Sequence, residues 1–144
     1  MRVLGIEGTA WAASAAVHDT DADADATTIF TDAYEPESGG IHPREAAEHM
    51  REAVPRMVRR ARRHADDDID AVAFSRGPGL GPCLRIVGTA ARATAQTLDV
   101  SLVGVNHMLA HLEIGRHTAG FDSPVCLNAS GANAHLLGFH NGRY

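Results

Sequence analysis

The stretch Arg2-Val3-Leu4-Gly5-Ile6-Glu7-Gly8-Thr9 decides which fold this sequence predicts. Its apolar residues indicate a short strand that stops at the polar Gly8-Thr9 pair, and residues 12–17 return as a second strand. Near the other end of the chain, residues 125–133 predict a strand that ends in a polar glycine turn, and residues 134–140 return as its partner. The sequence therefore predicts the same hairpin twice, each time with a polar tip that contains glycine.

The segment between the two hairpins alternates between strands and helices. Residues 29–34 predict a third strand, an amphipathic helix begins at Pro43, and residues 69–75 predict the next strand. A helix of small residues over 84–98 precedes an apolar run at 102–105, which predicts a buried strand. This order is typical of an α/β fold with a mixed sheet, in which three antiparallel strands are followed by a parallel βαβαβ arrangement.

Duplicated hairpins with polar glycine tips are characteristic of actin-like (ASKHA, ribonuclease H-like) nucleotide-binding folds. In these folds one tip from each lobe holds phosphate through backbone N–H groups. We therefore expect residues 1–120 to form the N-terminal lobe and residues 121–144 to begin a second lobe.

Two histidines follow the strand predicted at 102–105. Asn106 is placed to cap a helix in which His107 and His111 lie four residues apart, so that both imidazoles can reach one metal ion. Met108 occupies the position of the glutamate base in the H-E-x-x-H helix of zinc proteases, so peptide cleavage does not follow from this pair. Taken alone, the spacing is more often that of two core or surface histidines than of metal ligands.

Length and composition indicate a globular protein with one core and no membrane span. A chain of 144 residues with 44% hydrophobic content can bury one modest core, and no apolar run approaches the roughly 20 residues of a membrane span. The N-terminus is too short and too soon charged for a signal peptide, so we expect a cytoplasmic protein with no membrane partner. Cys83 and Cys126 lie in separate elements and are expected to be small buried apolar residues.

All 13 basic residues are arginine, and the 18 acidic residues give a net charge of −5. An acidic sequence without lysine suits a salt-rich cytoplasm and suggests a halophile. The net charge argues against a general basic nucleic-acid binder. Local contact with RNA stays possible, because the Debye length is only about 3 Å at molar salt.

The loop Arg76-Gly77-Pro78-Gly79-Leu80-Gly81-Pro82 predicts a place where the backbone closely approaches another group. It does not match a Walker loop, because no Gly-Lys-Ser/Thr follows, and Pro82 stands near the third glycine that a dinucleotide fingerprint requires.

Five segments in order along the chain resemble the universal tRNA threonylcarbamoyladenosine synthases, the catalytic subunit of the archaeal and eukaryotic KEOPS complex, formerly called O-sialoglycoprotein endopeptidases. The five segments span nearly the whole chain, and together they are highly specific for this family. The segments are Leu4-Gly-Ile-Glu-Gly-Thr-Ala10, Gly39-Gly-Ile-His-Pro-Arg-Glu-Ala-Ala-Glu-His49, Phe74-Ser-Arg-Gly-Pro-Gly-Leu-Gly-Pro82, Gly104-Val-Asn-His-Met-Leu-Ala-His111 and Ser130-Gly-Ala-Asn133.

The resemblance implies a reaction and a set of ligands. The family transfers a threonylcarbamoyl group from threonylcarbamoyl-AMP to the adenosine beside the anticodon in tRNAs that read ANN codons. It implies tRNA and KEOPS subunits, including a small protein kinase, as partners. It also implies one divalent metal per subunit, iron or zinc, and threonylcarbamoyl-AMP or ATP as the nucleotide ligand.

The same resemblance assigns site residues but names no catalytic residue. His107 and His111 match the metal-binding histidines, and Glu7, Gly8 and Thr9 match the first phosphate hairpin. The second substrate or nucleotide segment is matched by Asn128, Ala129, Ser130, Gly131, Ala132 and Asn133.

Three departures from the family pattern stand out. Asn128 replaces a tyrosine that can join the metal, and Ala132 replaces the second glycine of the turn. Family members are more than twice as long as this chain, so it resembles an N-terminal lobe that is expected to be inactive alone. Two alternatives are a non-catalytic scaffold paralogue, which would lack the metal pair, and a metalloprotease, which would need a glutamate after His107.

Overall fold

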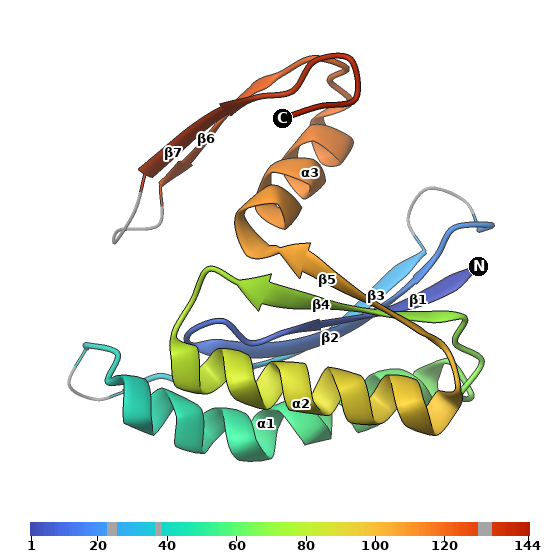
Figure 1. Ribbon diagram of the computed structural model, residues 1–144, viewed down its shortest axis with the longest axis vertical. Helices are drawn as coiled ribbons and strands as arrows, with labels where there is room; N and C mark the ends of the chain where they lie inside the picture. The colour runs from blue at the N-terminus through green and yellow to red at the C-terminus, as the bar shows by residue number, and fades with distance from the viewer. Residues whose placement is uncertain (23–25, 37–38, 130–133) are drawn as a thin grey trace. The chain divides into compact units, whose positions relative to one another are not determined.

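The computed structural model describes residues 1–22, 26–36, 39–129 and 134–144. These residues form two compact units, Met1–Val105 and Asn106–Tyr144. The first unit contains a five-stranded sheet with the strand order β3-β2-β1-β4-β5 (Figure 1). The strands are β1 (Arg2–Glu7), β2 (Ala12–Asp19), β3 (Thr27–Ala33), β4 (Ala71–Gly77) and β5 (Ser101–Asn106).

The strand directions in this sheet are mixed, as the sequence predicts. β1 pairs antiparallel with β2, and β2 pairs antiparallel with β3. On its other side β1 pairs parallel with β4, with Val3 opposite Ala71 and Ile6 opposite Phe74. The arrows of β4 and β5 point the same way in Figure 1. The predicted α/β fold with three antiparallel strands followed by parallel strands is therefore confirmed.

Helices α1 (Pro43–His64) and α2 (Gly81–Leu98) cover one face of the sheet (Figure 1). Alternate residues of β1 and β2 point into the interface with these helices, because side chains on a strand alternate between its two faces. α1 meets them with the apolar residues that recur every three or four positions. The side chains of this core include Leu4, Ile6, Ala13, Ala15, Val17, Met50, Val54, Met57, Val72, Val87 and Ala91.

One predicted property of β5 is wrong. The apolar run at 102–105 predicts a buried strand, but Leu102 is 37% exposed and Val103 is 52% exposed. β5 is the edge strand of the sheet, next to β4 alone. Its position in the sheet, rather than its apolar composition, sets its burial.

The second unit consists of α3 (His107–Ala119) and a hairpin of β6 (Val125–Ala129) and β7 (Ala134–Gly138). The two strands are antiparallel, with Asn128 opposite His135. α3 packs against β6, so it clusters with this hairpin and not with the five-stranded sheet. The lobe boundary expected near residue 120 stays a prediction.

The two cysteines differ in burial. Cys83 is buried in the core as predicted, whereas Cys126 is only partly buried, so that prediction is wrong for Cys126. Cys126 lies in β6, a strand of a two-stranded sheet, whereas Cys83 lies in α2 and belongs to the hydrophobic core. Among the described residues, no helix has the length and apolar character needed to cross a membrane.

Candidate metal and nucleotide site

α3 begins where β5 ends, and Asn106 caps it. The side-chain Oδ1 of Asn106 accepts hydrogen bonds from the backbone N–H groups of Met108 at 2.9 Å and Leu109 at 3.2 Å. This cap satisfies two of the N–H groups that the first turn of a helix leaves without partners. It therefore fixes the first turn, which carries His107, and confirms the predicted N-cap.

The imidazoles of His107 and His111 face each other from successive turns of α3. Their Nε2 atoms lie 3.2 Å apart, and the two rings are nearly perpendicular, with 4.5 Å between their centroids. Two nitrogens bound to one tetrahedral zinc at about 2.0–2.1 Å lie about 3.3 Å apart. The observed separation is close to this value, and it is also the distance of a hydrogen bond between the two imidazoles.

The pair provides only part of a metal site. Within the described ranges of the chain, no cluster of three or more His, Cys, Asp or Glu residues could hold a metal ion. A protein zinc site normally has three or four protein ligands. The His107–His111 pair can therefore orient a metal, but a complete site needs ligands beyond these two.

The second hairpin supplies the segment predicted to contact nucleotide. Asn128 and Ala129 end β6, whereas Ser130, Gly131, Ala132 and Asn133 lie outside the described residues. The register places His135 directly across from Asn128. Sequence reasoning missed His135, although a hairpin closed symmetrically around residues 130–133 would have predicted this pairing.

The first hairpin has a different geometry from an open phosphate loop. The carboxylate Oε1 of Glu7 accepts hydrogen bonds from the backbone N–H groups of Gly8 at 2.9 Å and Thr9 at 2.7 Å. The hydroxyl of Ser75, at the end of β4, donates to Glu7 Oε2. Ser75 was missed from the sequence, although extending the parallel register of β1 and β4 would have placed it beside Glu7.

The last turns of α3 contact the C-terminal residues 139–144. Glu113 accepts hydrogen bonds from the Arg116 guanidinium and from the Tyr144 hydroxyl, and Arg116 also lies over the ring of Phe139, 4.6 Å from its centroid. The hydrogen bonds from Arg116 and then from Tyr144 lower the pKa of Glu113 to about 2. These contacts tie α3 to the segment that follows β7.

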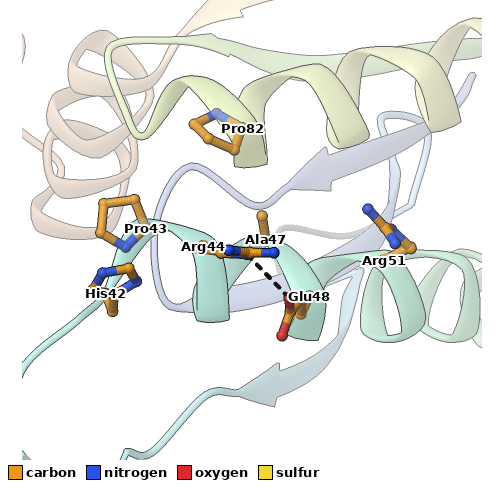
Figure 2. Close-up of a pocket in the computed structure, with 7 residues that line it drawn as sticks. All are labelled: His42, Pro43, Arg44, Ala47, Glu48, Arg51 and Pro82. Atoms are coloured by element: carbon orange, nitrogen blue, oxygen red, sulfur yellow. Dashed lines mark ion pairs between the residues drawn. The ribbon is translucent and has the colours of Figure 1, made fainter.

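A pocket of about 610 Å³ opens where α1 and α2 begin (Figure 2). Arg44 and Arg51 give it a cationic lining, and Glu48 pairs with Arg44 at 3.6 Å. Its remaining lining residues are His42, Pro43, Ala47 and Pro82. None of the residues predicted to bind metal or nucleotide lines this pocket.

The chain is similar in shape to YeaZ from Pseudomonas aeruginosa, with a TM-score of 0.66. The likeness covers 99% of this chain and 62% of YeaZ at 17% identity. An identity this low supports the fold alone, and it agrees with the predicted actin-like, ribonuclease H-like lobe.

The chain is similar in sequence to proteins that are named for tRNA threonylcarbamoyladenosine modification. It is 74% identical over its whole length to a "Probable bifunctional tRNA threonylcarbamoyladenosine biosynthesis protein" of Halobacterium salinarum, of which it covers 27%. It is 52% identical over 99% of its length to a tRNA N6-adenosine threonylcarbamoyltransferase of Methanocella arvoryzae, of which it covers 43%. Another relative, 69% identical, is from Haloarcula marismortui, which agrees with the haloarchaeal character of the lysine-free sequence.

The chain thus spans 27% of the length of the Halobacterium salinarum relative and 43% of the length of the Methanocella arvoryzae relative. The family model for tRNA N6-adenosine threonylcarbamoyltransferase matches residues 26–144, which include the His107–His111 pair. The chain belongs to the tRNA N6-adenosine threonylcarbamoyltransferase family.

Proposed function

We propose that this chain contributes the metal-binding lobe of an enzyme that transfers threonylcarbamoyl from threonylcarbamoyl-AMP to the adenosine beside the anticodon of tRNA. The observation that carries the proposal is the 3.2 Å separation of His107 Nε2 and His111 Nε2, within a chain of the transferase family. A non-catalytic scaffold would have no need for this pair. Met108 leaves a metalloprotease without its glutamate base.

His107 and His111 would hold one divalent ion, iron or zinc. When bound, such an ion would polarise carbamoyl or phosphate oxygens and stabilise developing negative charge. The chain's own contribution is to preorganise the two ligands. Asn106 fixes the start of α3, and the spacing along the helix sets the two Nε2 atoms at a distance that suits one ion.

The remaining ligands and partners follow from the family. We propose that residues 128–133 contact threonylcarbamoyl-AMP or ATP, with tRNA as the acceptor substrate. We also propose that KEOPS subunits, including a small protein kinase, assemble with the protein in the cytoplasm, where tRNA is modified. The names of the relatives as tRNA threonylcarbamoyladenosine biosynthesis proteins support the tRNA substrate.

Metal binding by the purified chain tests the role of the pair. We expect zinc to bind weakly, because two imidazoles make an incomplete site, and we expect His107→Ala to abolish the binding. His117→Ala is the matched control, because His117 is an exposed histidine on the same helix. Tight binding in calorimetry that His107→Ala leaves unchanged would contradict the assignment.

The isolated chain is expected not to modify tRNA, even when threonylcarbamoyl-AMP is supplied. Transfer requires the donor and the adenosine amine at near-attack distance, and a misplacement of about 1 Å can cost about a hundredfold in rate. Among the residues that the structure describes, none joins His107 and His111 to complete a metal site. Mass spectrometry of the nucleosides after incubation checks this, and turnover would show that these 144 residues contain a complete site.

A further inference from the structure

We propose that Glu7 is a positioning residue whose carboxylate acts as an internal anion. It binds the backbone N–H groups at the tip of the first hairpin and ties that tip to the end of β4. On this proposal the tip holds the loop before α2 in place and does not itself grip nucleotide phosphate. The proposal rests on contacts within Met1–Val105 and is independent of the metal pair.

A phosphate at the tip of the first hairpin would compete with Glu7 for the same donors. A phosphate held by this hairpin would need the N–H groups of Gly8 and Thr9, because backbone N–H groups are what such a tip offers to an anion. Both groups already donate to Glu7 Oε1, at 2.9 and 2.7 Å. Hydrogen bonds to a charged acceptor are roughly twice as strong as neutral ones. A phosphate would therefore have to displace a carboxylate and would meet its negative charge.

The tip is also buried. Thr9 is only 4% exposed, and Gly8 is also buried. A Cβ added to Gly8 would lie 2.6 Å from Val87 of α2 and 3.1 Å from the sulfur of Met50 of α1. The tip is therefore packed against both helices, which leaves little room there for a phosphate group.

The buried tip contacts the loop that precedes α2. The N–H of Leu80 donates to the carbonyl oxygen of Thr9 at 2.7 Å, and a Cβ on Gly79 would lie 2.6 Å from the same oxygen. Leu80 is the N-cap residue of α2 and makes no side-chain capping hydrogen bond. Glu7 thus fixes Thr9, and Thr9 in turn fixes the loop and the first residue of α2.

The geometry predicts how different substitutions behave. Glu7→Gln keeps one oxygen to accept from Gly8 and Thr9 and gains an amide that can donate to Ser75, so it should preserve the clamp. Glu7→Ala removes every one of these contacts. Ser75→Ala removes only the link to β4. Glu52→Ala is the control, because Glu52 is an exposed carboxylate on α1.

Amide hydrogen exchange of the full chain, followed by NMR, tests the proposal. In Glu7→Ala we expect protection of the Gly8 and Thr9 amides to fall about tenfold or more, whereas Glu7→Gln restores it to within about threefold of the parent. Ser75→Ala should lower the protection of these two amides by a smaller factor. This variant still tests the proposal if Glu7→Ala does not fold. Unchanged protection of both amides in Glu7→Ala or Ser75→Ala would overturn the proposal.

Titration of the parent chain with inorganic pyrophosphate separates positioning from phosphate binding. We expect the Gly8 and Thr9 amide resonances and the fluorescence of Trp11, the single tryptophan, to stay unchanged. Trp11 follows the tip by two residues and is 51% exposed, so it can report a movement there. A saturable shift of these signals would show that phosphate displaces Glu7, which would overturn the proposal while leaving the metal-binding role of His107 and His111 intact.

Discussion

The two hairpins of this protein have the same sequence pattern and opposite surroundings. In β1 and β2 the inward residues are buried under two helices, and Leu4 has no exposed surface. In β6 and β7 the corresponding apolar face is open, with Val125, Leu127 and Leu136 each about 70% exposed (72%, 69% and 71%). Alternation of apolar residues therefore determines that a hairpin forms and which face is apolar, but not what covers that face.

The two hairpins also differ in the surroundings of their polar residues. The tip of the first is buried, and Glu7 occupies its N–H groups. In the second hairpin, β6 and β7 place Asn128 and His135 opposite each other. If nucleotide phosphate is held by one of the two hairpins, the geometry of the first leaves that role to the second.

Replacing one leucine with alanine in each hairpin should give the largest difference in the free energy of unfolding. Leu4→Ala should lower the free energy of unfolding by about 2.7–5 kcal/mol, because it leaves a cavity in a packed core. Leu127→Ala should change it by less than about 0.5 kcal/mol, because that side chain is 69% exposed. Urea denaturation followed by circular dichroism measures both values. A cost for Leu127→Ala close to that of Leu4→Ala would show that the face of β6 and β7 is covered in solution.

Replacing one glycine with alanine in each region should give a smaller difference in the free energy of unfolding. The Cβ of Gly79→Ala would lie 2.6 Å from the carbonyl oxygen of Thr9 and 2.7 Å from its Cβ, so backbone must shift, at an expected cost of about 1–3 kcal/mol. In β7, Gly138→Ala meets no atom within 4 Å and should be close to neutral. Thermal unfolding of the two variants compares them, and equal midpoints would contradict the close packing of the first tip.

The smallest effect concerns acid stability of the second region. The pKa of Glu113 is lowered from 4.5 to about 2, so the unfolded chain takes up the proton first as the pH falls. The contacts with Arg116 and Tyr144 should therefore stabilise the fold fully above pH 4.5, and this contribution should be lost as the pH falls towards 2. The Glu113 side chain is 46% exposed, so solvent screening keeps the effect below about 1 kcal/mol.

Carboxyl NMR titration of Glu113 checks its pKa, and the acid dependence of unfolding checks the linkage. Glu113→Gln should remove this part of the pH dependence, whereas Glu52→Gln should leave it unchanged. A titration midpoint near 4.5 would show that the contacts between α3 and the C-terminal residues do not persist in solution.

Local sequence determined several features correctly. Asn106 caps α3 because its short polar side chain can reach the N–H groups that a first helical turn leaves without partners. Asn141-Gly142 has the composition of a tight turn, and both residues have positive φ, 50° and 76°, between the bridged residues His140 and Arg143. The positions of His107 and His111 followed from the pitch of a helix. These features depend on residues within a few positions of each other, so the sequence alone suffices.

Tertiary structure decided the features that join distant segments. The family resemblance implies that Glu7, Gly8 and Thr9 form a phosphate hairpin. It does not reveal the hydrogen bond from Ser75 to Glu7, which lies 68 residues away in the sequence and forms because β4 pairs with β1. The apolar composition of β5 predicted burial, and its place at the edge of the sheet decided against it. Local pattern thus fixed the strands, helices and candidate ligands, because their causes are short-range. Burial and the partner of each polar group depend on which elements pack together, and only the tertiary structure specifies that.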